Sequence, residues 1–136
     1  FEKLEHLVAS TEALLHEGLF GVRPSCEAIV GEEDGKVVCF ALFFHNFSTF
    51  LTKKGLYLED LYVLQSHRGK GYGTKMLARL AQIAVERECG RFEWSVLDWN
   101  EPAIQFYKSM GADVMPDWRI CRLTGDTLTA MAERRS

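Results

Sequence analysis

Three glycines and two cationic side chains follow one another near the middle of the chain. Gly69, Gly71 and Gly73 alternate with other residues directly after Arg68, and Lys70 lies among them. A strand-like run precedes them and an amphipathic helical pattern follows, so bare backbone N–H groups would meet at a helix N-terminus. Unpaired N–H groups and the helix dipole both favour an anion there, and the two cations add to that preference. The stretch therefore predicts a phosphate-binding turn that needs no metal.

Two adjacent carboxylates, Glu59 and Asp60, stand shortly before this turn in an otherwise apolar strand pattern. In a regular strand their side chains would point to opposite faces of the sheet. Acids are poor strand formers, and a buried unpaired carboxylate is costly. The alternative to a functional pair is thus that one of the two acids is a paired structural residue and the other is simply exposed. A phosphate site beside strand-borne acids suggests a phosphorylated cofactor next to a cationic substrate.

The glycines by themselves also fit a tight strand-to-helix turn that binds nothing. A dinucleotide-binding turn would need GxGxxG in an opening βαβ unit, whereas this chain has GxGxG after half of its length. The GxxxxGK[ST] pattern of a P-loop is absent from the sequence.

The elements that position these residues follow from hydrophobic periodicity and from turn residues. An Asp34-Gly35 hairpin turn, a loop at 45–55 and a helix-ending Gly90 are expected between them. We predict helices at 3–17, 73–89, from the cap Asn100 to Gly111, and from the cap Asp126 to about Arg134; we predict strands at 27–30, 36–44, 56–64, 92–97 and 118–123. This order predicts a mixed α/β (α+β) fold and a single domain over residues 1–136.

Composition excludes several classes of function. The net charge is −3 and no basic block is present, which argues against nucleic acid as a partner. No apolar run is long enough to span a membrane, and no secretory signal is seen. The four cysteines form no CxxC pair and no ligand cluster with the histidines, so we expect no metal and a reducing cytoplasm. Cys39 and Cys121 lie in apolar runs and are predicted to be buried, and His67 is predicted to be solvated.

The pattern Arg68-x-x-Gly71-x-Gly73 resembles the acetyl-CoA loop of the GCN5-related N-acetyltransferase (GNAT) superfamily. Similarity runs from Phe1 almost to Trp118, and four further segments resemble the spermidine/spermine (diamine) acetyltransferase branch: 57–63, 99–102, 106–108 and 111–112. The resemblance implies the acyl-CoA N-acyltransferase fold, a central mixed, mostly antiparallel sheet flanked by helices. It also implies that the first strand and helix of that fold are missing from this chain, and that residues 112–118 form a shortened loop.

The resemblance implies acetyl-CoA as co-substrate. Residues 69–74 would hold its pyrophosphate, and the backbone of residues 61–63 would pair with the pantetheine arm like an added strand. A bulge would splay this strand from the next one and place an amide that polarises the thioester carbonyl. The implied contacts are Leu61, Tyr62, Val63, Arg68, Gly69, Lys70, Gly71, Tyr72, Gly73, Thr74, Asn100, Pro102, Ala103 and Tyr107.

Tyr107 is the residue to which the resemblance assigns the general acid that protonates the leaving thiolate. Its spacing alone favours a core aromatic, since Ile104, Tyr107 and Met110 would share one helix face. Glu59 would bind the ammonium group and relay its proton through water. The implied substrate-binding residues are Glu2, Glu59, Asp60, Glu93, Trp94, Ser95 and Asp117.

These residues predict direct acetyl transfer in a ternary complex to a polyamine, a diamine or an amine-bearing amino acid. No cysteine stands at a motif position that could carry the acetyl group. A non-catalytic acyl-CoA sensor and a protein lysine or N-terminal acetyltransferase are the alternatives. The resemblance further implies a homodimer that pairs through the strand at Trp118.

Overall fold

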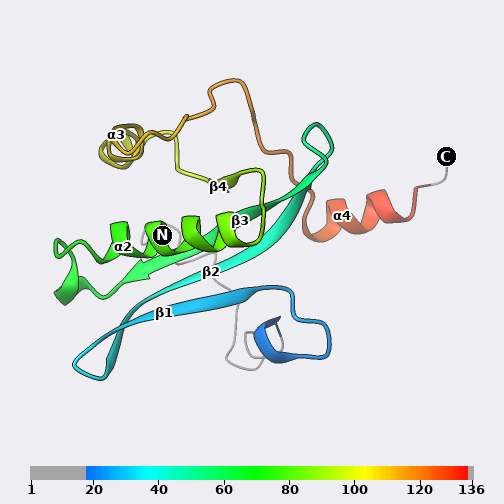
Figure 1. Ribbon diagram of the computed structural model, residues 1–136. Helices are drawn as coiled ribbons and strands as arrows, with labels where there is room; N and C mark the ends of the chain where they lie inside the picture. The colour runs from blue at the N-terminus through cyan, green and yellow to red at the C-terminus, as the bar shows by residue number, and fades with distance from the viewer. Residues whose placement is uncertain (1–17, 135–136) are drawn as a thin grey trace. The chain divides into compact units, whose positions relative to one another are not determined.

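A computed structural model of the chain describes residues 18–134. The predicted helix at 3–17 and the substrate candidate Glu2 lie outside the described residues. The elements are β1 (Glu27–Glu33), β2 (Lys36–Ser48), β3 (Lys53–Val63), the 3-10 turn η2 (Gln65–His67), α2 (Tyr72–Glu86), β4 (Phe92–Trp94), α3 (Glu101–Ser109) and α4 (Gly125–Ala132) (Figure 1).

The four strands form one sheet in the order β1-β2-β3-β4. The pairs β1–β2 and β2–β3 are antiparallel, whereas β3 and β4 run parallel. Asp34 and Gly35 connect β1 to β2 with φ angles of 53° and 78°, the positive values that a primed two-residue hairpin turn requires. The predicted mixed, mostly antiparallel sheet and its first hairpin are therefore confirmed.

Helix α2 lies along one face of this sheet (Figure 1) and contacts β2 and β3. Its apolar residues recur at helical spacing and are buried: Met76, Leu77, Leu80, Ile83 and Ala84. They meet the inward-pointing residues of the central strands, among them Ala41, Phe43, Leu56 and Leu58. This core fixes the end of β3 and the start of α2, between which the glycine-rich turn lies.

Several predicted boundaries are wrong, among them the end of β1, which extends to Glu33 and not only to residue 30. The chain at 45–55 is not a loop, because β2 continues to Ser48 and β3 starts at Lys53, with residues 45–48 paired to residues 53–56. Cross-strand pairing here outweighs the weak strand preference of the polar residues. β4 ends at Trp94 and not at 97, because its ladder with β3 ends at the Leu58–Trp94 pair.

Gly90 does not end α2 as predicted. The residue with left-handed backbone after the helix is Glu88, at φ 58°. Gly90 serves a close approach instead, since a Cβ atom there would lie 2.9 Å from Leu51 Cδ1 and 3.2 Å from Lys53 Cβ. Its N–H group donates to the carbonyl oxygen of Lys54 at 2.9 Å, which brings the chain from α2 onto the sheet.

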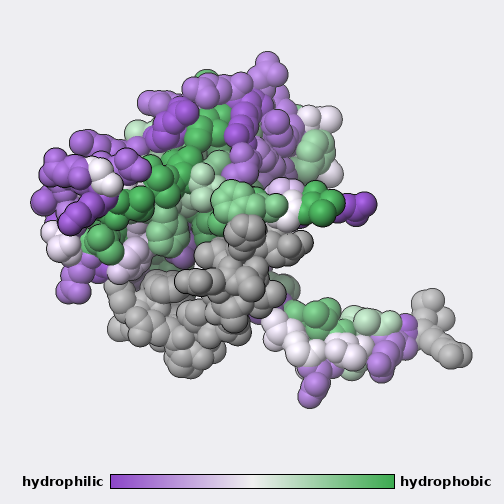
Figure 2. Space-filling model, turned by 90° about the horizontal axis from the view of Figure 1, so that it is seen from below, coloured by the Kyte–Doolittle hydropathy of each residue, from purple (hydrophilic) through white to green (hydrophobic). Residues whose placement is uncertain are grey.

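The chain divides into two compact units, Phe1–Ser95 and Val96–Ser136. In the second unit the predicted strand at 118–123 is absent, because these residues pair with no strand of the described chain. Trp118 and Ile120 are 74% and 73% exposed, and Cys121 is exposed and not buried as predicted. α4 starts at Gly125, one residue before Asp126, and its hydrophobic side chains appear green at the right of Figure 2.

An ion-pair cluster ties the C-terminal end of α2 to β1 and β2. Arg87 donates from Nη1 and Nη2 to the two carboxylate oxygens of Glu27 at 2.7 and 2.9 Å, and its Nη1 lies 3.3 Å from Nε2 of His45. The hydrogen bond from Arg87 holds the pKa of Glu27 below its ordinary value of 4.5. Burial, followed by the charge of Arg87, lowers the pKa of His45.

Glu27→Gln should lower the free energy of unfolding by about 1 kcal/mol near neutral pH, since Glu27 and Arg87 are partly solvent-exposed. Because the pKa of Glu27 is lowered in the folded state, its ion pair stabilises the fold at pH values above the ordinary pKa. This stabilisation is lost as the pH falls through the folded-state pKa. The difference between variant and wild type should therefore vanish under acid conditions. Urea titrations at neutral and acid pH measure this. Glu86→Gln, which breaks an exposed pair with Arg79, is the control and should change little.

Candidate active site

The glycine-rich turn has the backbone that a phosphate cradle requires. Gly69 and Gly71 have φ angles of 83° and 85°, in the region that glycine adopts without strain. Gly71 is the N-cap of α2, and the N–H of Lys75 donates to its carbonyl oxygen at 3.0 Å. The N–H groups of Tyr72, Gly73 and Thr74 precede this first helical bond and are thus left for a ligand.

Arg68 joins this turn to the end of β3. Its Nε donates to the carbonyl oxygen of Val63 at 3.0 Å, and its guanidinium lies 5.5 Å from the centre of the Tyr62 ring. The side chain thereby closes the loop that η2 forms between β3 and α2. Arg68 fixes the position of the turn in this structure, while its charge remains beside the cradle.

Sequence reasoning missed an acid beside the cradle. Glu33, the last residue of β1, lies 2.7 Å from Nε2 of His67 and 3.8 Å from Nζ of Lys70. Burial, followed by a hydrogen bond to Glu33, raises the pKa of Tyr72. The prediction that His67 is solvated is therefore wrong. The pairing arises because the hairpin end of β1 lies beside the turn, a neighbourhood that only the sheet order reveals.

A β-bulge in β3 lies at the acid pair. Leu58 pairs with Phe43 and Asp60 pairs with Leu42, so Glu59 is the extra residue without a partner position on β2. Leu42 and Phe44 lie on the same face of β2, and their partners Asp60 and Tyr57 must share that face as well. The regular alternation of faces is therefore interrupted between Tyr57 and Asp60 at this bulge.

The two acids have different surroundings. Glu59 is exposed and Asp60 is half-buried. Burial raises the pKa of Asp60, partly offset by a hydrogen bond from the backbone of Leu61. Aromatic pairs flank Asp60 along the strand, Phe40 with Tyr62 on one side and Phe44 with Tyr57 on the other. Burial thus makes the Asp60 carboxyl hold its proton more tightly than an ordinary aspartate does.

β3 and β4 separate just before the bulge. Their parallel ladder covers only Leu56–Leu58 and Phe92–Trp94. The backbone of Leu61, Tyr62 and Val63 continues along β2 on its other side, beyond the ladder with β4. An edge of this kind can pair with an extended ligand. The bulge and the separation of the two strands agree with the geometry that the resemblance implied.

The substrate candidates on β4 are held by local contacts. Glu93 accepts from Nε of Arg91 at 2.9 Å, and the Trp94 ring lies 4.9 Å from that of Phe92. Ser95 is hydrogen-bonded through its hydroxyl to that of Tyr57. Glu93 and Trp94 are half-buried, and Ser95 is exposed.

Helix α3 carries the second group of predicted residues. The side chain of Asn100 accepts a hydrogen bond from the N–H of Ala103 at 3.3 Å, and Pro102 lies in the first turn, which confirms the predicted cap. Tyr107 is half-buried, and its ring lies 5.7 Å from that of Phe106. Ile104 is buried whereas Met110 is 40% exposed, so the predicted three-residue core face is only partly buried.

The first compact unit brings together three stretches: the acid pair with residues 61–63, the turn at 68–74, and residues 93–95. Asn100, Pro102, Ala103 and Tyr107, together with the exposed Asp117, belong to the second unit. The predicted phosphate turn and acids thus lie in the first unit, and the predicted general acid Tyr107 lies in the second.

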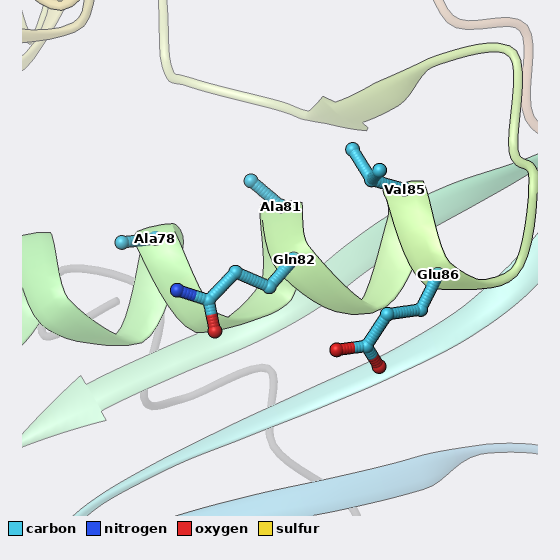
Figure 3. Close-up of a pocket in the computed structure, with 5 residues that line it drawn as sticks. All are labelled: Ala78, Ala81, Gln82, Val85 and Glu86. Carbon is cyan, nitrogen blue, oxygen red and sulfur yellow. The ribbon is translucent and has the colours of Figure 1, made fainter.

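Other features of the described residues do not resemble an active site. An open depression of about 510 Å³ lies on α2, lined by Ala78, Ala81, Gln82, Val85 and Glu86 (Figure 3). It is apolar and lies away from the turn. No cluster of three or more His, Cys, Asp or Glu side chains that could hold a metal occurs within residues 18–134. Every helix in that range is too short or too polar to cross a membrane.

Comparison with known proteins gives consistent relatives. The chain is 49% identical over 98 residues to L-ornithine N5-acetyltransferase NATA1 of Arabidopsis thaliana. This match covers 72% of this chain but only 43% of that protein. It is 36% identical over 145 residues to thialysine N-epsilon-acetyltransferase of Mus musculus, covering 98% of this chain and 85% of that enzyme. These curated relatives are amine N-acetyltransferases.

Among solved structures, an integron cassette protein from the mobile metagenome of V. cholerae superimposes with a TM-score of 0.82. It is 30% identical in sequence, and the match covers 98% of this chain and 85% of that one. The model of the acetyltransferase (GNAT) family matches residues 3–112 and so extends across both compact units. The glycine-rich turn, the bulged strand and the capped helix that carries Tyr107 all fall within this match, and the chain belongs to the acetyltransferase (GNAT) family.

Proposed function

We propose that this chain transfers an acetyl group from acetyl-CoA to a primary amine of a small polyamine, diamine or amine-bearing amino acid. The observation that supports it most is that the residues proposed for the amine and those proposed for acetyl-CoA lie along one strand and the turn that follows it. The bulge with Glu59 and Asp60 lies in β3, and the glycine turn with its N–H groups follows the end of the same strand. The names of the curated relatives favour the same reaction class.

In this proposal, the turn holds the pyrophosphate of acetyl-CoA and the open backbone of Leu61–Val63 holds its pantetheine arm. The neutral amine attacks the thioester carbonyl carbon, and the C–S bond breaks as the amide C–N bond forms. Tyr107 gives its phenolic proton to the leaving thiolate, and the proton that the attacking nitrogen loses as the amide forms restores the phenol. The proton that the ammonium group loses before attack passes through water to Glu59, with Asp60 as the neighbouring acid.

A panel of amines tests the proposal, with the free thiol of released CoA as readout. Ornithine, a lysine analogue, putrescine and spermidine represent the substrate class, and a lysine-containing peptide represents protein acetylation. We expect thiol release with at least one small amine and little with the peptide. Acetyl-CoA binding without any amine-dependent thiol release would favour the sensor instead. Glu59 and Tyr107 favour the enzyme, since a sensor needs neither.

Glu59→Gln should raise the KM for the amine and shift the pH optimum upward, because the amine must then lose its proton without the relay. Glu59 is exposed, so the loss of its charge should raise KM by no more than about fivefold, the range of an exposed pair. Amine kinetics over a pH series give both quantities, and acetyl-CoA affinity should stay unchanged.

Asp60→Asn is the matched variant for this test, since it removes one carboxylate next along the strand. If Glu59→Gln leaves both the pH profile and the amine KM unchanged while Asp60→Asn alters them, Asp60 and not Glu59 accepts the proton. Because the pKa of the Asp60 carboxyl is raised, loss of this group should shift the acid limb of the pH–rate profile.

We further propose that the protein is a homodimer. Exposed apolar side chains in the C-terminal unit support this, in particular Trp118, Ile120 and Leu123. Sedimentation at micromolar concentration should give the mass of two chains, and Ile120→Asp should shift it toward one. A monomer in both cases would contradict the proposal.

A further inference from the structure

Both strands beside the proposed amine site leave their ladder at the same level. The last pair of the β3–β4 ladder joins Leu58 to Trp94. The next residue of β3 is Glu59, the bulge, and Ser95 is the first residue after β4. Figure 1 shows β4 beside only part of the longer β3. Beyond this pair no backbone hydrogen bonds of the β3–β4 ladder hold the two strands together, so side-chain contacts have to fix the position of Ser95.

One side-chain hydrogen bond crosses this point. The hydroxyl of Tyr57 bonds to that of Ser95, at an O···O distance of 2.5 Å. Tyr57 lies within the ladder, opposite Glu93, and its ring packs 5.2 Å from that of Phe44 on β2. Ser95 is therefore connected through Tyr57 to the two central strands of the sheet.

The position of this bond relates it to the amine side of the proposed site. Tyr57 and Asp60 share one face of the sheet, since their partners Phe44 and Leu42 do. The turn at 68–74 follows the opposite end of β3, beyond Val63. Removing the Tyr57 hydroxyl should thus alter the surroundings of Asp60 and Ser95 more than those of the turn at 68–74.

We propose that the Tyr57–Ser95 hydrogen bond is a positioning contact, which fixes the point where β4 leaves the sheet and so shapes the amine-binding side of the site. This inference rests on the proposed function. Tyr57 acts here through Ser95, and its hydroxyl has no chemical role. Nothing in the strand periodicity singles out this tyrosine, because its importance depends on where the two strands separate.

The test compares Tyr57→Phe, Ser95→Ala and the double variant, each as the full chain. Each single variant should raise the amine KM about three- to tenfold, the size expected for one lost hydrogen bond. The acetyl-CoA KM should be unchanged. The double variant should be no worse than the singles, because both remove the same bond. Ser95→Thr, which keeps the hydroxyl, should raise the amine KM less than Ser95→Ala does.

Urea unfolding of the wild type, Tyr57→Phe, Ser95→Ala and the double variant gives a second readout that needs no activity. The double-mutant cycle should give a coupling between the two positions in stability. Zero coupling would overturn the inference even if no amine were acetylated, an outcome that by itself would overturn only the proposed function. In an active wild type, unchanged amine KM values or an equal rise in the acetyl-CoA KM would also overturn it.

Discussion

Replacing Tyr107 by phenylalanine should lower kcat by about 10²–10⁴-fold, the usual contribution of a positioned general acid. The leaving thiolate would then depart without a proton from the protein. Phenylalanine keeps the ring and its packing against Phe106, so the fold of α3 and the affinity for acetyl-CoA should change little. Steady-state release of CoA thiol measures kcat, and calorimetry measures acetyl-CoA affinity.

Tyr62→Phe is the matched control, because it removes the same hydroxyl from a residue whose proposed role uses its backbone alone. It should keep kcat within a few-fold of wild type. Near wild-type turnover of Tyr107→Phe at every pH would show that Tyr107 is not the acid. In that case Tyr107 would have only a packing role, on the helix face that it shares with the buried Ile104.

Local chemistry allowed most of the fold to be predicted. The Asp34-Gly35 turn, the apolar stripe of α2 and the Asn100 cap each depend on a few neighbouring residues, and each is confirmed. The errors lie where non-local pairing decides. β2 extends through its polar end because β3 offers partners, and the strand predicted at 118–123 is absent because no described strand pairs with it.

The candidate site divides in the same way. The glycine turn was recognisable because consecutive residues build it. The roles of Glu33 and Tyr57 were not, since each depends on residues far away in the sequence, His67 and Ser95 respectively. The bulge at Glu59 is a matter of register between two strands. No periodicity within β3 alone contains that register, so the shared face of Tyr57 and Asp60 required the structure.

Gly71→Asp should weaken acetyl-CoA binding by about 100-fold or more. An aspartate at the N-cap accepts hydrogen bonds from the N–H groups of the first turn, which are the donors that the pyrophosphate needs. Its charge also repels the phosphates. The loss of one or two charge-assisted hydrogen bonds, at about 1.5–3 kcal/mol each, gives a change of this size. Calorimetric titration of acetyl-CoA measures it directly.

Two variants separate this effect from backbone strain. Gly71→Ala meets the same positive φ of 85° and the same open space but leaves the N–H donors available, so its affinity should fall far less. Gly125→Asp makes the same change at the start of α4, another glycine with positive φ and open space, and should leave acetyl-CoA binding intact. An unchanged affinity in Gly71→Asp would remove the turn as the pyrophosphate site, because no arrangement that uses these N–H groups tolerates a carboxylate among them.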